Sequence, residues 1–129
     1  MWLYNKTPEF IQCSEKLELS KEVLDAIESW AKSVGRVQTN KQKRCFCSPN
    51  NIFEIWTARV PDPDANRGTS GGFRLVYFFN IKESAIYVSK IEKRNSLGGK
   101  TERPKDQQKF TEYLEELKKY LLRELDNIV

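Results

Sequence analysis

The chain has 129 residues, which suits one domain over residues 1–129 with a single hydrophobic core. Charged residues make up 31% and apolar residues 39% of the sequence, a balance that excludes a disordered or membrane-embedded chain. The N-terminal sequence has neither the charged start nor the apolar run of a secretory signal, and no stretch is apolar for long enough to cross a membrane. We therefore expect a cytoplasmic protein without a membrane partner.

The first part of the chain predicts a short strand and two helices. Residues 2–4 suit a strand, and Thr7 followed by Pro8 has the pattern of an N-cap and a first helical residue. Ser20 opens a second helix by the same logic; its apolar residues are spaced by three and four, and Gly35 ends it. Together the two helices predict a helical hairpin.

The middle of the chain predicts a loop and then a sheet. Residues 38–51 are polar, basic and rich in asparagine, which indicates a loop or an irregular extension with little share in the core. Three stretches dense in β-branched and aromatic residues predict strands: 52–60, 73–80 and 85–92. The connection between the last two is short enough to form an antiparallel hairpin, whereas the connection before them contains two prolines and is a longer loop. We expect a small antiparallel sheet.

The C-terminal part predicts a mobile segment and a long helix. Residues 95–103 contain two adjacent glycines and no apolar period. A helix then covers about 105–128, and its apolar stripe is Phe110, Tyr113, Leu114, Leu117, Tyr120, Leu121 and Leu125. We expect the stripe to pack on the core; a partner helix or a dimer seam is the alternative. The predicted fold class is α+β, with an N-terminal helical hairpin packed on a small antiparallel sheet and a long C-terminal helix.

Charge and cysteine content bear on the partners. The net charge of +4 and the pI near 9.0 favour an anionic partner. Residues 35–53 contain four basic side chains and no acidic one, and residues 90–105 contain six against two. The three cysteines are an odd number in a chain without an export signal, and no histidine could complete a zinc site. We expect reduced thiols, no metal and no other cofactor.

Two stretches resemble a known family. The sequence TARVPDPDANRGTSGGFRLVYFF, followed by IYVSKIEKR, is similar to the RelE/HigB group of type II toxin ribonucleases in the RelE/ParE superfamily. In that group a loop ending in Gly-Gly-Phe/Tyr-Arg leads into the central strand, and a basic cluster ends the next strand. The resemblance covers about residues 50–95. It implies a single RelE-like toxin domain that cleaves messenger RNA without a metal, often on the ribosome, and is held silent by a cognate antitoxin protein.

Three basic residues match the family's catalytic positions. Cleavage of RNA by its own 2′-hydroxyl requires a proton acceptor, a proton donor and positive charge near the phosphate. Arg74 matches the central-strand arginine and is predicted to grip phosphate oxygens; the alternative is a salt bridge to a carboxylate across the sheet. Lys93 and Arg94 match the basic strand end, where they would stabilise the phosphate or protonate the leaving group. The alternative is that Lys93 and Arg94 are only solvent-exposed residues at the end of a strand.

The general base is the remaining catalytic group to assign. The family's usual lysines in the strand before the loop are missing, and Glu54 and Trp56 stand at the corresponding positions. Because the chain has no histidine, Glu54 is the candidate base. Glu92, a lysine of lowered pKa or Tyr77 are the alternatives.

Further RNA contacts are predicted at Arg67, Trp56, Arg59 and Lys90. Arg67 lies in the glycine-containing loop and could close over RNA, and Trp56 could stack on a base, although core packing is its alternative. Two other functions remain open. A ParE-like inhibitor of DNA gyrase is favoured by the missing lysines and histidine, and a non-catalytic RNA-binding module would keep the same fold.

Overall fold

The computed structural model of the chain describes residues 1–60, 72–93 and 104–128. The elements follow in the order β1 (Leu3–Lys6), α1 (Pro8–Lys16), α2 (Lys21–Ser33), β2 (Gln42–Cys47), β3 (Phe53–Val60), β4 (Phe73–Asn80), β5 (Ala85–Lys93) and α3 (Pro104–Ile128), with a short 3₁₀ helix at Pro49–Asn51. The expected α+β class and the long C-terminal helix are confirmed. In this part of the chain, no helix combines the length and the apolar character needed to cross a membrane.

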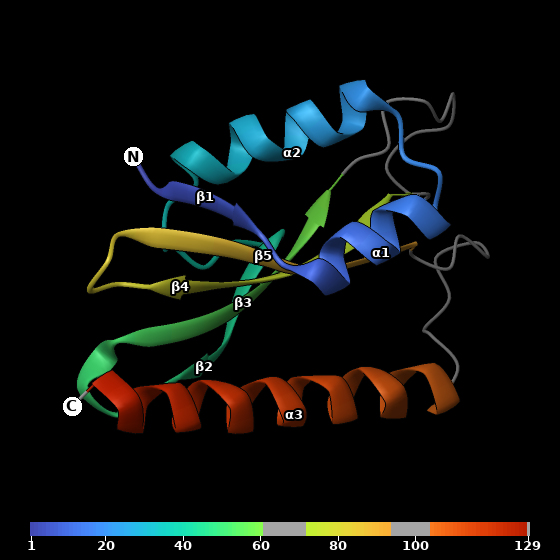
Figure 1. The fold of residues 1–129 in the computed structure, drawn as a ribbon. Coiled ribbons are helices and arrows are strands. Elements are labelled where there is room, and N and C mark those ends of the chain that lie inside the picture. The colour runs from blue at the N-terminus through green and yellow to red at the C-terminus, as the bar shows by residue number, and fades with distance from the viewer. Residues whose placement is uncertain (61–71, 94–103, 129) are drawn as a thin grey trace.

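The strands form one five-stranded sheet in the order β1-β5-β4-β3-β2, with α1 and α2 on one face and α3 on the other (Figure 1). β2 to β5 pair antiparallel, but β1 pairs in parallel with β5, so the expected antiparallel sheet is a mixed one. A parallel pair needs a long connection, and the chain from α1 to β4 lies between these two strands. Nothing in the sequence of β1 itself shows which strand it joins.

The helices α1 and α2 begin where the sequence predicts. The side-chain oxygens of Thr7 and Ser20 accept hydrogen bonds from the backbone N–H groups of Phe10 (3.2 Å) and Val23 (3.3 Å). However, β1 precedes both helices, and they contact different strands, α1 lying on β5 and α2 beside β1. An N-terminal helical hairpin is therefore not confirmed.

The segment 38–51, expected to be a loop, contains the edge strand β2. This strand pairs antiparallel with β3 and has a bulge between Arg44 and Phe46. An edge strand has one neighbour and faces solvent along its other side, so basic and polar residues suit it, and the alternation of apolar residues that predicts a strand is absent. The loop prediction was wrong for this reason.

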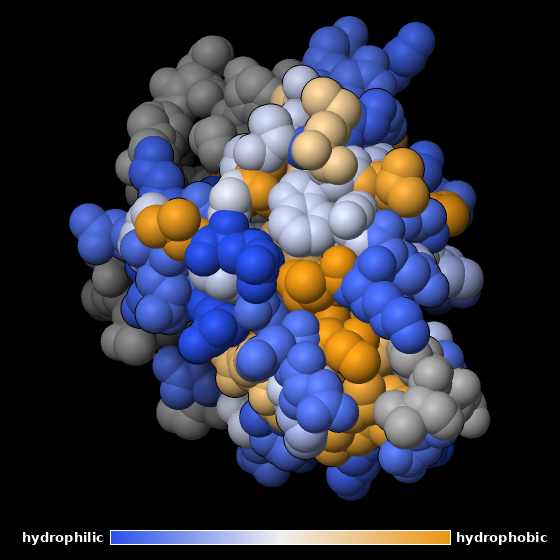
Figure 2. All heavy atoms as spheres, turned by 90° about the vertical axis from the view of Figure 1, so that its left-hand side faces the viewer, coloured by the Kyte–Doolittle hydropathy of each residue, from blue (hydrophilic) through white to orange (hydrophobic). Residues whose placement is uncertain are grey.

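The sheet separates two hydrophobic cores. The core under α1 and α2 contains large buried side chains from all layers: Phe10, Val23, Ile27, Trp56, Leu75, Tyr77, Phe79, Ile86 and Ile91. The core under α3 contains Phe53, Ile55, Val76, Phe78, Leu117, Leu121 and Leu125. The expected packing of the terminal helix on the core is confirmed for its apolar stripe except Tyr120, whose side chain is 49% exposed. Apolar side chains also reach the surface at the end of the molecule where β4 connects to β5, in a central band between hydrophilic ones (Figure 2).

Candidate nucleic-acid interface

Cross-strand pairing places a row of charged residues on the sheet face that α3 covers. Arg74 of β4 lies opposite Arg59 of β3 and opposite Glu92 of β5. Residues paired across strands point to the same face, as do residues two apart along one strand. Val76 packs into the core under α3, so Arg59, Arg74 and Glu92 share the α3 face.

A second row on the same face adds two lysines. Thr57 of β3, Val76 of β4 and Lys90 of β5 pair in that order, and Lys43 of β2 lies opposite Thr57. We call the four basic residues of the two rows the cationic strip: Lys43, Arg59, Arg74 and Lys90. Three of them were predicted RNA contacts or catalytic residues. Lys43 was not among the predicted contacts, because its segment was expected to be a loop and not the strand β2.

Arg74 is held between a carboxylate and an aromatic ring. Its Nε lies 2.7 Å from Oε1 of Glu92, and its Nη2 also donates to that oxygen. Its Cζ lies 3.6 Å from the ring centroid of Phe110 on α3. The side chain is 20% exposed. These contacts fix the orientation of the guanidinium group, and they mean that a phosphate has to compete with Glu92 for it.

Lys90 lies beside Tyr113 of α3. The lysine Nζ is 4.5 Å from the centroid of the tyrosine ring. The Tyr113 hydroxyl is hydrogen-bonded to Ser89, and burial raises the pKa of Tyr113 above its usual range. The phenol therefore stays protonated at neutral pH, where it can donate a proton but cannot act as a base.

Lys93 does not join the cationic strip. It lies opposite Phe73, which packs in the core under α1 and α2, so its side chain is on the other face from Arg74. The cause is a bulge in β5: Val76 pairs with Lys90 and Tyr77 pairs with Val88, which leaves Ser89 as an extra residue. The extra residue reverses the face of every later side chain in β5. The other two predicted cations, Arg67 and Arg94, lie outside the described residues.

Glu54 also lies on the face away from the strip. It is 3% exposed, its Oε2 is 2.8 Å from Arg36 Nη1 and 3.5 Å from Arg44 Nη1, and its Oε1 accepts a hydrogen bond from Trp56 Nε1 at 3.0 Å. A carboxylate held in this way anchors β2 and the segment before it to β3. The carboxylate that the structure places beside Arg74 is Glu92, so Glu92 takes the place of Glu54 as the candidate base.

Two other candidates on this face, the predicted RNA contact Trp56 and the alternative base Tyr77, are core residues. Trp56 is 1% exposed, and its ring packs edge-on against Phe79, with 6.3 Å between centroids. It therefore offers no face to a nucleotide base. Tyr77 is fully buried, and burial raises its pKa to about 12, so its hydroxyl stays protonated at neutral pH.

We expect Glu54→Gln to lower stability and leave RNA cleavage unchanged. Glutamine keeps the shape of the side chain but removes the charge that holds Arg36 and Arg44. These arginines are 39% and 47% exposed, so solvent screens the pairs and the loss in unfolding free energy is about 1–2 kcal/mol. Urea unfolding and RNA cleavage assays check this, with the exposed Glu15→Gln as control. Loss of cleavage at unchanged stability would restore Glu54 as the base.

Two aromatic residues of the interface, Phe110 and Tyr113, were assigned to the core stripe by sequence. Their helical spacing does not indicate that they cover Arg74 and Lys90, because that depends on where α3 crosses the sheet.

Among the described residues, no group of three or more histidine, cysteine, aspartate or glutamate side chains is placed to hold a metal ion. Compared with known proteins, the sequence matches no protein-family model and shows no significant similarity to a curated protein.

Proposed function

We propose that the cationic strip binds single-stranded RNA and that the chain cuts it by attack of the RNA's own 2′-hydroxyl. The observation that supports this best is the row of Arg59, Arg74 and Glu92, in which the Arg74 guanidinium group contacts the Glu92 carboxylate and Arg59 is the cross-strand neighbour of Arg74. Lys43 and Lys90 in the adjoining row add positive charge that attracts a polynucleotide.

Each group has a role in this reaction. Arg74 would hold the non-bridging phosphate oxygens and stabilise the charge that develops as the 2′-oxygen bonds to phosphorus. Glu92 would accept the proton of the 2′-hydroxyl, and Lys90 would donate a proton to the 5′-oxygen as its bond to phosphorus breaks. The products are a 2′,3′-cyclic phosphate and a 5′-hydroxyl. No step of this route requires a metal ion.

The sequence resemblance supports a finer proposal. A RelE/HigB-like chain would be the toxin of a type II toxin-antitoxin system, acting in the cytoplasm on messenger RNA, on the ribosome. Its protein partner would be the cognate antitoxin. These assignments rest on the residues from about 50 to 95 that carry the resemblance.

Binding would begin at the exposed end of the strip. Lys43 and Arg59 are exposed, whereas Arg74 is 20% exposed and paired with Glu92. A phosphate would therefore meet the exposed cations first and then compete with Glu92 for Arg74. Glu92 thus has two opposing effects: it weakens RNA binding and it accelerates cleavage.

The variant Glu92→Gln separates these effects. We expect the neutral side chain to strengthen RNA binding by about 3-fold or more, because the competing charge is gone, and to slow cleavage by about 100-fold, because the proton acceptor is lost. Binding is measured by fluorescence anisotropy on an RNA with 2′-deoxy substitutions that prevent cleavage. Cleavage is measured in single turnover on the unmodified RNA, with the exposed Glu22→Gln on α2 as control.

Other outcomes favour the alternative functions. Tight RNA binding by the unaltered protein without cleavage, with and without ribosomes, would indicate a non-catalytic RNA-binding module. Inhibition of DNA gyrase supercoiling by a protein that does not bind RNA would indicate the ParE-like function. Either result would overturn the proposal.

A further inference from the structure

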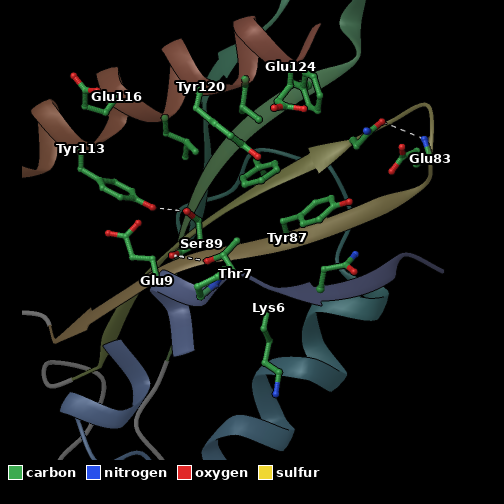
Figure 3. Close-up of a pocket in the computed structure, with 17 residues that line it drawn as sticks. Lys6, Thr7, Glu9, Glu83, Tyr87, Ser89, Tyr113, Glu116, Tyr120 and Glu124 are labelled. Atoms are coloured by element: carbon green, nitrogen blue, oxygen red, sulfur yellow. Dashed lines mark hydrogen bonds between the residues drawn. The ribbon is translucent and has the colours of Figure 1, made fainter. Parts of the chain in front are cut away.

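A groove of about 780 Å³ lies between α3 and the β1 edge of the sheet, away from Lys43 and Arg59 on β2 and β3 (Figure 3). Its floor is apolar and aromatic. The rings of Phe78 and Tyr87 stack there with centroids 4.9 Å apart and planes 9° from parallel, next to Leu117 and Leu121 of α3. The groove takes no part in the proposed RNA chemistry.

The rim of the groove is acidic. Among the described residues that line it are four glutamates, Glu9, Glu83, Glu116 and Glu124, and one lysine, Lys6. In Figure 3 the Lys6 side chain extends away from these glutamates. Lys6 also contributes to lowering the pKa of Glu28 on α2, after the larger effect of the hydrogen bond from Lys32. Glu116 is also paired with Lys119 at 3.7 Å, but the lysine and glutamate side chains are 67% and 72% exposed, so solvent screens this pair. Four glutamates against one lysine leave the lining with an excess of negative charge.

The groove follows one face of α3 for three helical turns. The α3 residues that line it recur at helical spacing: Tyr113, Glu116, Leu117, Tyr120, Leu121 and Glu124. At 1.5 Å per residue this stripe is about 16 Å long. Tyr120, in its middle, is 49% exposed, so an aromatic ring of the groove faces solvent. An elongated apolar face of this length suits a polypeptide segment better than a compact small molecule.

We propose that this groove binds a basic amphipathic segment of a partner protein. The apolar floor would take the hydrophobic side chains of the segment, and the glutamates on both walls would pair with its lysines or arginines. RNA does not fit, because the rim repels phosphates. The inference does not depend on the proposed nuclease activity, since it uses none of the cationic strip.

The test uses two synthetic peptides of equal length and leucine content, each designed as an amphipathic helix. One carries lysine and the other glutamate at every polar position. We expect the lysine peptide to bind the full chain with a micromolar dissociation constant in fluorescence anisotropy, more weakly as salt is raised, and the glutamate peptide not to bind. Backbone amide shifts at Tyr87 and Leu121 should follow the titration.

Charge-matched variants localise the binding. The double variant Glu83→Lys/Glu116→Lys should weaken binding of the lysine peptide by about 10-fold or more. The control double variant Glu15→Lys/Glu22→Lys makes the same change in net charge at exposed positions of α1 and α2. It should change the affinity by less than about 2-fold. On α3, Tyr120→Ser should weaken binding, and Leu122→Ser, also exposed but outside the groove lining, should not.

Three outcomes would overturn the inference. They are equal binding of both peptides, an equal loss in the two pairs of charge variants, and amide shifts confined to the cationic strip. Self-association of the chain that Glu83→Lys with Glu116→Lys abolishes would identify a second copy, not a partner protein, as the occupant.

Discussion

We expect Arg74→Ala to reduce the rate of RNA cleavage by about 100-fold or more. The variant removes the guanidinium group that Glu92 and Phe110 hold in a fixed orientation, which in the proposed reaction supplies the main positive charge beside the developing phosphorane. RNA affinity should fall less than the cleavage rate, because Arg59, Lys43 and Lys90 remain. The measurement is single-turnover cleavage of a labelled single-stranded RNA together with anisotropy binding.

Two further variants show whether a loss of cleavage comes from the missing charge or from the missing planar group of Arg74. Arg74→Lys keeps the charge but loses the planar group with two parallel N–H donors, so it should recover only part of the rate. Arg123→Ala makes the same charge change at an exposed position of α3 and should cleave normally. Circular dichroism verifies that each variant is folded. Full activity of a folded Arg74→Ala protein would remove the central claim about this site.

Trp56→Ala should lower the free energy of unfolding by about 3–5 kcal/mol. The ring is 1% exposed in the core under α1 and α2, so its removal leaves a cavity, and the buried Glu54 loses a hydrogen-bond donor. Urea unfolding followed by circular dichroism measures the loss. Trp56→Phe keeps most of the apolar contact and removes only the N–H group, and should cost about 1–2 kcal/mol.

The same variant distinguishes the two roles considered for Trp56, stacking on a nucleotide base and packing in the core. If the indole stacked on a nucleotide base, Trp56→Ala would weaken RNA binding while stability stayed close to that of the unaltered protein. A large loss of stability, with normal RNA affinity in the folded fraction at low temperature, is the outcome that the structure predicts.

Much of the local structure could be predicted from the sequence. Thr7 and Ser20 begin helices because each side chain can accept a hydrogen bond from an N–H group three residues later, a property of adjacent residues. The stripe of the terminal helix packs on the core because its period matches one helical face. Arg74 was also recognised as a candidate catalytic residue, and Arg59 and Lys90 as candidate RNA contacts; their functional roles are proposals.

The partners of these residues could not be predicted. In a hairpin without a bulge, the pairing would continue regularly from Asn80 and Ala85. Arg74 would then lie opposite Ile91, and Lys93, two residues further along β5, would point to the same face as Arg74. The bulge at Ser89 instead places Glu92 opposite Arg74 and turns Lys93 to the other face. Glu54 was chosen over Glu92 as the base because no property of the sequence shows which carboxylate lies beside Arg74.

By itself the sequence determined the α+β class, the starts of α1 and α2, the strands β3 to β5 and the apolar face of α3, because each depends on residues close together in the chain. Only the tertiary structure decided the parallel pairing of β1, the strand β2, the faces of Lys93 and Glu92, and the acidic groove beside α3. These depend on register and packing between distant segments, where one extra residue in a strand reverses the direction of every side chain after it.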